Sequence, residues 1–361
     1  MQRARDLAER GRYTVAPNPL VGCVVVRDGR IVGEGWHERA GSHHAEAVAL
    51  DAAGEDARGA TMYVTLEPCN CRSRSSEVSC TELILEAGVK KVVIGHIDPN
   101  PRMNGRSVRL LREAGVDVEV LDAAPEFERQ NEQWFWYKRT GRPFVHLKLA
   151  ASLDGRIACA GGDSKWVTGP EARRRAHLLR AEAGAVLVGI GTVLADDPLL
   201  TVRDVPGEVP AVRRVVLDAR LRMPLESALV RSAGEAPLIV FAAEGAPSGK
   251  ALALQERGVR VIETPLVDGI FDPVFVLDEL GRLGVRGVLV EGGGETAAHF
   301  VRRSLVNKMT VFYAPKLVGS DGRPMVGELG VAGMAHALPF TVSEVERLGD
   351  DVAVTFYPRE R

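Results

Sequence analysis

Three residues of the types that bind zinc, and one carboxylate, lie at informative spacings in the first quarter of the chain. His44 and Glu46 stand at the expected start of one helix and Cys80 at the start of another; between them, Cys69 follows Pro68. One imidazole and two thiolates leave the fourth position of a tetrahedral zinc ion to water, whose pKa the ion lowers toward neutrality. Glu46, if unliganded, can take that proton and return it to a leaving group. The pattern therefore predicts a hydrolytic zinc site.

A purely structural zinc ion is the alternative, because such sites have four protein ligands and Cys71 could supply the fourth. Cys69 and Cys71 are, however, closer than the usual spacing of about two to four intervening residues. His43 is another candidate ligand. His44, however, is the histidine that stands two residues before Glu46, as the motif requires, so we expect His43 at the surface or behind the ligands. A His-x-Glu triplet followed by Pro-Cys and a further Cys is the signature of zinc-dependent base deaminases.

Two glycine-rich turns in the second half of the chain indicate a nucleotide site. Gly189 and Gly191 follow the apolar run AVLV, and the glycines at 292–294 lie between the run GVLVE and an expected helix. Glycines let the backbone approach a phosphate, and a helix N-terminus offers unpaired N–H groups to it. Each turn alone is also compatible with a tight strand-to-helix connection.

The elements that must position these residues alternate between strands and helices. Apolar runs such as VGCVVV, TMYVTL and KKVVIG alternate with helical segments that we expect to end near Gly54, Gly88 and Gly115. A polar, aromatic helix over residues 126–142 interrupts this alternation, and a second series begins after it. Its aromatic residues 134–137 could stack on bases, but packing as a linker helix between domains is the preferred interpretation. The sequence thus predicts two α/β domains, 1–142 and 143–361.

Composition excludes several classes of function. The 361 residues carry 46 Lys and Arg against 48 Asp and Glu, a formal net charge of -2, which disfavours binding of nucleic acid or anionic membrane. The longest apolar runs fall short of the roughly 20 residues of a membrane span, and the N-terminus does not resemble a signal peptide. The five cysteines argue against a disulfide framework. We therefore expect a cytoplasmic protein, with Cys23, inside VGCVVV, as a core residue.

The first domain resembles the deaminase half of the bifunctional riboflavin-biosynthesis deaminase/reductase family. The resemblance is carried by GRYTVAPNPLVGCVVVRDGRIVGEGWHERAGSHHAEAVAL, GATMYVTLEPC and CTELILEAGVKKVVIGHIDPNPRMNGRSVRLLREAGVDVEV. It implies a cytidine-deaminase-like three-layer fold. It also implies that Asn18 and His37 line a pyrimidine pocket; from the residues alone they would be a turn residue and a surface residue.

One loop departs from this family. Ten residues, 70–79, separate the two zinc-binding cysteines where the family typically has eight, and Cys71 stands in place of a histidine. Arg74 keeps a basic position and, with Arg72, is suited to binding a phosphate, although a solvated basic loop is the alternative. Because the family uses this loop to contact substrate, an alternative function is a reductase alone, or a deaminase/reductase with a different deaminase substrate.

The second domain resembles the reductase half of the same family, over HLKLAASLDGRIACAGGDSKWVTGPEARRRAHLLRAEAGAVLVGIGTVLADDPLLTVR. The resemblance implies a dihydrofolate-reductase-like fold that uses NADPH. The implied NADPH contacts are Ala150, Trp166, Thr168, Thr192, Asp196, Gly293, Gly294, Glu295, Thr296, Ala297, Ala298 and His299. The implied substrate contacts are Ser164, Arg180, Leu200, Arg203 and Glu291.

The chemistry of a ribosyl reduction suits these residues. Arg180 and Arg203 are natural partners of a substrate phosphate, and Glu291 can hydrogen-bond a sugar hydroxyl or a ring edge. Hydride addition at C1 requires the ring-opened imine and a proton donor, for which Lys148 and Asp196 are candidates. For Asp154, in SLDG, the alternative to a role in the reaction is a structural one, holding the turn before Gly155.

The resemblance as a whole implies a two-step enzyme of riboflavin biosynthesis. It would deaminate 2,5-diamino-6-(5-phosphoribosylamino)pyrimidin-4(3H)-one with zinc, and then reduce the ribosyl group to ribityl with NADPH. The implied partners are this small molecule and further copies of the chain, in a homodimer or larger assembly. A nucleic-acid-binding protein is a third interpretation, which the balanced charge disfavours.

Overall fold

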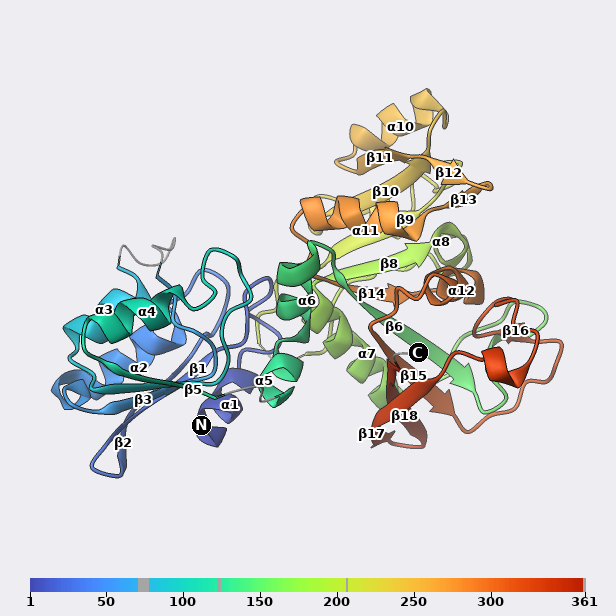
Figure 1. Cartoon of the computed structure of the whole chain (residues 1–361). Helices are drawn as coiled ribbons and strands as arrows, with labels where there is room; N and C mark the ends of the chain where they lie inside the picture. The colour runs from blue at the N-terminus through green and yellow to red at the C-terminus, as the bar shows by residue number, and fades with distance from the viewer. Residues whose placement is uncertain (71–77, 122–124, 206, 360–361) are drawn as a thin grey trace. The chain divides into compact units, whose positions relative to one another are not determined.

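The computed structural model describes residues 1–70, 78–121, 125–205 and 207–359 (Figure 1). These residues form two compact units, Met1–Gly141 and Arg142–Arg361, and each is described by itself. Within the described residues, no helix has both the length and the apolar composition needed to cross a bilayer.

The first unit contains a five-stranded sheet in the order β2-β1-β3-β4-β5. β1 is antiparallel to β2 and β3, whereas β3, β4 and β5 are parallel. The strands are β1 (Gly22–Arg27), β2 (Arg30–Trp36), β3 (Thr61–Val64), β4 (Lys91–Ile94) and β5 (Asp117–Val120). The helices are α1 (Gln2–Glu9), α2 (Ala45–Ala53), the 3-10 turn η1 (Gly54–Ala57), α3 (Cys80–Glu86), α4 (Arg106–Glu113), α5 (Pro125–Gln130) and α6 (Glu132–Thr140).

Helices cover both faces of this sheet. Along β1, Cys23 and Val25 point into the core formed with α2, α3 and α4, while Val24, between them, packs with α1. Cys23 is fully buried, which confirms its prediction as a core residue. The unit is therefore a three-layer α/β structure. The glycines predicted to end its helices, Gly54, Gly88 and Gly115, all have positive φ, as expected of residues that terminate a helix.

Two glycines of β2 determine how closely α2 approaches the sheet. A Cβ on Gly35 would lie 2.4 Å from the carbonyl oxygen of Ala45, and a Cβ on Gly33 would lie 2.1 Å from that of Ala49. Because neither glycine has a Cβ, α2 lies directly against β2. The start of α2, where His44 is the N-cap, is thereby fixed against the sheet.

The aromatic segment near residue 134 belongs to the first unit and forms α6. Phe135 is buried and its ring meets the ring of His96 edge-on, with centroids 4.6 Å apart. Trp134 donates from Nε1 to Oδ1 of Asp98 at 3.0 Å. These contacts with the segment after β4 favour packing over base stacking as the role of these two rings.

The second unit contains a nine-stranded sheet in the order β11-β10-β9-β8-β14-β6-β15-β18-β17. The seven strands from β11 to β15 in this order are parallel, and β18 and β17 continue the sheet antiparallel. The sheet consists of β6 (Phe144–Ser152), β8 (Ala185–Gly189), β9 (Arg213–Leu217), β10 (Leu238–Ala243), β11 (Arg260–Thr264), β14 (Gly287–Glu291), β15 (Lys308–Ala314), β17 (Phe340–Leu348) and β18 (Asp351–Pro358). Two small pairs are β7 (Arg156–Ala158) with β16 (Arg323–Pro324), and β12 (Leu266–Val267) with β13 (Ile270–Phe271).

Helices cover both faces of the second sheet as well. They are α7 (Pro170–Ala183), α8 (Ile190–Asp196), α9 (Ala228–Arg231), α10 (Ser248–Gln255), α11 (Pro273–Arg282) and α12 (Gly294–Arg302), with the 3-10 turn η2 (Met334–His336). Leu147 of β6 packs in a core with α11 and α12, whereas Leu289 of β14 and Phe312 of β15 pack with α7 on the opposite face. The unit is again a three-layer α/β structure.

The strand order reverses at one place in this sheet. The chain passes from β6 through α7 to β8 and leaves a position between these strands that β14 fills about 100 residues later. In open parallel sheets, ligands bind outside the carboxyl ends of the strands at such a reversal of strand order. The expected location is therefore the carboxyl ends of β8, β14 and β6.

Candidate functional site

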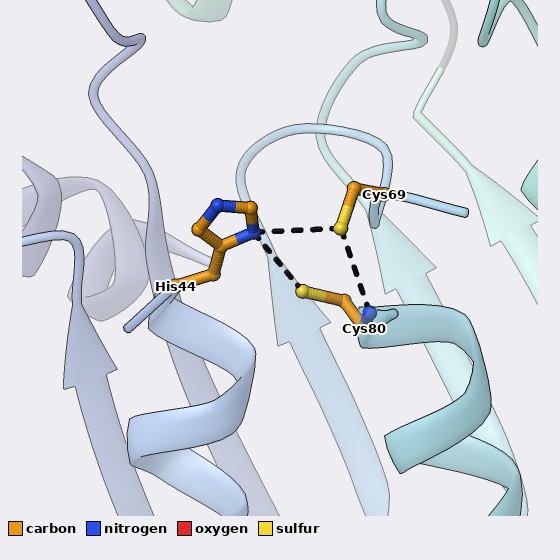
Figure 2. A group of neighbouring side chains, drawn as sticks. All are labelled: His44, Cys69 and Cys80. Carbon is orange, nitrogen blue, oxygen red and sulfur yellow. Dashed lines mark hydrogen bonds between the residues drawn. The ribbon is translucent and has the colours of Figure 1, made fainter. Parts of the chain in front are cut away.

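His44, Cys69 and Cys80 converge in the first unit from three separate elements (Figure 2). Their ligand atoms all lie within 4.8 Å of one another. Nδ1 of His44 lies 3.3 Å from Sγ of Cys80 and 3.4 Å from Sγ of Cys69. A tetrahedral zinc site with ordinary bond lengths separates a nitrogen and a sulfur ligand by about 3.5 Å. The residues present therefore fit a zinc ion that keeps one position for water.

Local hydrogen bonds hold the two cysteines. Ser79 begins α3 with a capping box, in which its Oγ accepts from the backbone N–H of Glu82 and the Glu82 carboxylate accepts from the Ser79 backbone N–H. Thr81 donates from its backbone N–H and its hydroxyl to the carbonyl oxygen of Cys69, at 3.0 and 2.9 Å. Hydrogen bonds with Cys80 and His44 lower the pKa of Cys69 to about 4, although burial of the thiol opposes this. Cys69 is thus held in the thiolate form that binds metals.

Glu46 lies in the first turn of α2, two residues after His44, and only 3% of its surface is exposed. It is outside the group of three ligand residues. Burial raises the pKa of Glu46 to about 7, against the opposing effect of the nearby His44. A carboxyl group with a pKa near neutrality can both accept and return a proton, which general acid and base catalysis requires.

Asn18 and His37 lie beside the zinc ligands. Nδ1 of His37 is 3.1 Å from the carbonyl oxygen of His43, so this nitrogen must carry the hydrogen. Nε2 is then the acceptor for Nδ2 of Asn18, at 3.0 Å. The His37 ring is buried and meets the ring of His44 edge-on at 5.4 Å, which corrects the interpretation of His37 as a surface residue. The side chain of His43 is exposed, as predicted.

Glu67 is a buried residue whose role the sequence analysis missed. Its carboxylate accepts hydrogen bonds from the backbone N–H groups of Asp98, Gly105 and Ser107 and from the Ser107 hydroxyl, at 2.5 to 3.2 Å. Because Glu67 is two residues from Cys69, these bonds fix the segment after β4 to the cysteine-bearing turn. In the sequence, the signal that could have pointed to Glu67 was its place in the segment LEPC, beside the zinc-binding Cys69. Arg74 and Cys71 lie outside the described residues.

Lys148, Arg180 and Glu291 form a buried charged cluster in the second unit. Lys148 and Glu291 are paired across β6 and β14, with Nζ 3.9 Å from Oε2. Arg180, from α7, donates to both carboxylate oxygens of Glu291, at 2.7 and 2.9 Å, and from Nη1 to the carbonyl oxygen of Thr201 at 2.9 Å. Burial opposes ionisation of Glu291, but the charges of Arg180 and Lys148 lower its pKa to about 2. Burial also lowers the pKa of Lys148.

The remaining predicted contacts of the second unit fall into two groups. Lys165 pairs with Asp196 at 3.7 Å, which brings the segment with Ser164, Trp166 and Thr168 to the end of α8. Trp166 is 64% exposed, with the guanidinium of Arg173 4.5 Å from its ring centroid.

The other group is the segment that Arg180 holds through Thr201. Leu200 is buried there with a positive φ of 53°, and the Arg203 side chain is exposed. Asp154 accepts from the Ser152 hydroxyl and from the backbone N–H groups of Val318 and Gly319, which supports the structural interpretation of that residue.

The two glycine-rich turns meet at the carboxyl ends of β8 and β14. A Cβ on Gly189 would lie 2.8 Å from Oγ1 of Thr296, so the two turns are in contact. A Cβ on Gly294 would lie 2.6 Å from the carbonyl oxygen of Pro324, so packing against the backbone requires this glycine. A Cβ on Gly191 or Gly293 would instead enter open space. Neither of these two has a positive φ. The turn therefore leaves room where a phosphate can approach the backbone before α12, which fits the phosphate part of a nucleotide cofactor.

Two family models match the chain, one in each unit. The "Cytidine and deoxycytidylate deaminase zinc-binding region" matches residues 1–96, and the "RibD C-terminal domain" matches residues 143–354. The riboflavin biosynthesis protein RibD of Aquifex aeolicus is 43% identical over 356 residues, which cover 99% of this chain and 97% of that protein. The chain belongs to the RibD family. The RibD of Escherichia coli is 41% identical, over 98% of this chain and 97% of its own.

Solved RibD structures have the same arrangement of elements. That of Acinetobacter baumannii RibD has a TM-score of 0.89 with 37% identity, covering 99% of this chain and 98% of that one. A Thermotoga maritima protein described as a diaminohydroxyphosphoribosylaminopyrimidine deaminase/5-amino-6-(5-phosphoribosylamino)uracil reductase has a TM-score of 0.84 with 37% identity, covering 99% and 97%.

These likenesses confirm the predicted fold class and the predicted activity. The fold is a cytidine-deaminase-like domain followed by a dihydrofolate-reductase-like domain. Like other members of the RibD family, the chain is a bifunctional deaminase and reductase of riboflavin biosynthesis that acts on a small molecule. Its cofactors are zinc in the deaminase domain and NADPH in the reductase domain.

Proposed function

We propose that residues 1–142 hydrolytically deaminate 2,5-diamino-6-(5-phosphoribosylamino)pyrimidin-4(3H)-one, with His44, Cys69 and Cys80 as the zinc ligands and Glu46 as the proton carrier. The observation that carries this proposal is the convergence of one nitrogen and two sulfur atoms within 4.8 Å, with a buried carboxylate two residues from the histidine. When bound, zinc lowers the pKa of the attacking water. Glu46 accepts that proton and passes it to the substrate and the departing ammonia.

Asn18 and His37 recognise the pyrimidine ring in this proposal. His37 is held neutral by its burial, which lowers the pKa of the ring, and it fixes one N–H of the Asn18 amide. The amide oxygen and second N–H of Asn18 are then available to the edge of a pyrimidine. Arg74 contacts the phosphate of the substrate.

In the second domain, residues 143–361, we assign reduction of the ribosyl group to ribityl. The turn at Gly293, Gly294, Glu295 and Thr296, continuing through Ala297, Ala298 and His299, binds NADPH together with Ala150, Trp166, Thr168, Thr192 and Asp196. Substrate contacts come from Lys148, Ser164, Leu200, Arg203 and Glu291, with Arg180 behind Glu291. The contact of the two glycine-rich turns supports this assignment.

Lys148 is the proton donor in this reduction. NADPH supplies a hydride to C1 of the ring-opened imine, and the imine nitrogen takes a proton. The burial of Lys148 lowers its pKa and so makes it a stronger acid near neutral pH. Arg180 donates from three of its nitrogens to Glu291 and Thr201, so it orients Glu291, and the exposed Arg203 is the phosphate contact. This division differs from the expectation that both arginines bind the phosphate.

A cytoplasmic location and a homodimer or larger assembly complete the proposal. The odd number of cysteines supports a reducing compartment. The edge strand β17 supports self-association, because its exposed side chains include Val342 and Val345, which are 54% and 65% exposed.

Removal of zinc tests the deaminase assignment. Dialysis against a chelator is expected to abolish ammonia release from the diamino substrate and to leave NADPH-dependent reduction of the deaminated substrate unchanged, because all three ligands lie in the first unit. Added zinc should restore deamination. Zinc content and both rates would be measured for the wild type, Cys69→Ser and Cys71→Ser. Loss of zinc from Cys71→Ser would show a closed site with four protein ligands, one histidine and three cysteines, and would reject the catalytic site. Retention of zinc by Cys71→Ser, with loss from Cys69→Ser, supports the proposal.

A further inference from the structure

We propose that two basic side chains, Arg173 and Lys316, are positioning residues of the reductase. They hold in place the segment 166–168, which belongs to the coenzyme site in the function proposed above. The inference rests on that function, because Trp166 and Thr168 are its coenzyme contacts. The two basic side chains act through this segment and not by touching the coenzyme themselves.

The carbonyl oxygens of residues 166, 167 and 168 all accept hydrogen bonds from cationic side chains. Nζ of Lys316 donates to the first two, at 2.7 and 2.9 Å. Nη1 of Arg173 donates to the third, at 2.7 Å. Hydrogen bonds with a charged donor are roughly twice as strong as those between neutral groups. Because this segment lies outside the helices and strands, these bonds fix a stretch of backbone that no helix or sheet ladder holds.

Arg173 also fixes the ring of Trp166. Its guanidinium carbon lies 4.5 Å from the ring centroid, so it covers one face of the indole. The residue is otherwise open to a ligand, with 64% of its surface exposed. A planar guanidinium can lie on an aromatic face and donate hydrogen bonds from its edge, which the compact ammonium of a lysine cannot do at the same time. Arg173 therefore fixes both the ring and the carbonyl group two residues after it.

A buried acid holds the point where this segment enters α7. Asp351, the first residue of β18, is 4% exposed, and its Oδ2 accepts from the backbone N–H of Gly169 at 2.6 Å. Gly169 is the N-cap of α7 and has no side chain with which to cap the helix. The carboxylate of Asp351 supplies a negative charge at this N-terminus, where the helix dipole favours it. The segment 166–168 is thus continuous with a firmly held helix start.

The helix α7 joins the coenzyme segment to the buried charged cluster. Arg173 and Arg180 are seven residues apart, two turns of the helix, so they lie on one face about 10 Å from each other. Arg173 holds the coenzyme segment, and Arg180 donates to both carboxylate oxygens of Glu291, the partner of Lys148. One helix therefore sets the position of the coenzyme relative to the proton donor. Because hydride transfer depends on such alignment, loss of Arg173 or Lys316 should lower kcat as well as coenzyme affinity.

The test measures binding of NADPH and of the deaminated substrate separately, by calorimetry on the full chain, and kcat from NADPH oxidation. The variants are Arg173→Gln, Arg173→Lys, Lys316→Gln and Lys316→Arg. The matched control is Arg174→Gln, because Arg174 is the exposed neighbour of Arg173 on the same helix.

The variants should divide by the bonds that they keep. Arg173→Gln, Arg173→Lys and Lys316→Gln are expected to weaken NADPH binding about tenfold and to lower kcat by a similar factor, since each removes a charge-assisted contact. Lys316→Arg should stay within about threefold of the wild type, because a guanidinium group can donate to both carbonyl oxygens. The affinity for the deaminated substrate and the rate of ammonia release should be unchanged in every variant.

Near-ultraviolet circular dichroism reports on the Trp166 ring directly. An aromatic side chain contributes to this spectrum only when its surroundings hold it in one orientation. The part of the spectrum lost in Trp166→Phe is the contribution of this ring. Arg173→Gln should lose the same part, and Arg174→Gln should keep it.

The outcomes separate this inference from the function on which it rests. Normal NADPH binding and kcat in Arg173→Gln and Lys316→Gln would overturn the positioning role and leave the NADPH site standing. Equal weakening of NADPH and of the deaminated substrate would also overturn it, because a general distortion of the domain affects both ligands. If Lys316→Arg binds NADPH as weakly as Lys316→Gln, the two carbonyl contacts are not what Lys316 contributes. A wild type that does not bind NADPH would reject the proposed coenzyme site itself.

Discussion

Replacement of Glu46 by glutamine is expected to slow ammonia release about 10³-fold, the typical contribution of a positioned acid and base. Glu46 is buried in the first turn of α2, two residues from a zinc ligand, and burial raises its pKa to about 7. Glutamine has nearly the same shape but cannot accept the proton from water or return one to the departing ammonia. The rate would be measured as ammonia released from the diamino substrate, without NADPH.

Two controls make the Glu46→Gln result specific. The variant should contain as much zinc as the wild type, because Glu46 lies outside the three-ligand group. It should also reduce the deaminated substrate at the wild-type rate, because the reductase residues are in the second unit. A variant that keeps its zinc and deaminates within tenfold of the wild type would mean that another group carries the proton.

Replacement of Glu291 by glutamine is expected to have the second largest effect, on both reduction and stability. Glu291 is the counter-charge of Arg180 and Lys148 in a buried cluster, with Arg180 bound to both of its oxygens. Without this carboxylate, two buried positive charges repel each other, and removal of one partner from a buried pair typically costs about 3–5 kcal/mol. Reduction should fall at least about 100-fold, since Lys148 loses the group that positions it.

The same variant should change the pH dependence of stability. The pKa of Glu291 in the folded chain is lowered to about 2, from an ordinary value of 4.5. A lowered pKa means that the carboxylate stabilises the fold above pH 4.5 and that this contribution is lost as the pH falls toward 2. Denaturant unfolding of the wild type and Glu291→Gln at a series of pH values would therefore show a difference that narrows over this window.

Glu256→Gln is the matched control for this experiment, because Glu256 is an exposed acid that follows α10 and has no ion-pair or hydrogen-bond partner for its carboxylate among the described residues. It should match the wild type in stability and reduction. If Glu291→Gln is as stable as the wild type at neutral pH and reduces substrate normally, the charged cluster has no part in the reaction.

The zinc site was readable from the sequence because its parts depend on local signals. Ser79 and Glu82 are spaced as a capping box, which begins a helix at Cys80 whatever the rest of the fold does. The glycine-rich turn before α12 likewise follows directly from a strand, glycines and a helix in succession. The family resemblance then supplied Asn18 and His37, which the structure brings to His44.

Contacts between distant segments could not be read in this way. Arg180 and Glu291 are 111 residues apart and meet only because β14 inserts between β6 and β8. From the sequence, Arg180 was suited to binding a phosphate. The sequence did not show that the carboxylate of Glu291 already accepts hydrogen bonds from two of its nitrogens. The bonds from Glu67 to the segment of Gly105 and Ser107 depend in the same way on the pairing of β3 with β4.

The ratio of ammonia released to NADPH oxidised, with the diamino substrate and both cofactors present, tests the two-step account most directly. The account predicts one ammonia per NADPH, ammonia release that continues when NADPH is omitted, and NADPH oxidation that stops after zinc removal unless deaminated substrate is supplied. NADPH oxidation on the deaminated substrate with no ammonia from the diamino substrate would contradict it. That result would leave a reductase whose deaminase domain acts on a different substrate or on none. The segment 70–79, whose sequence departs from the family pattern, would account for the change.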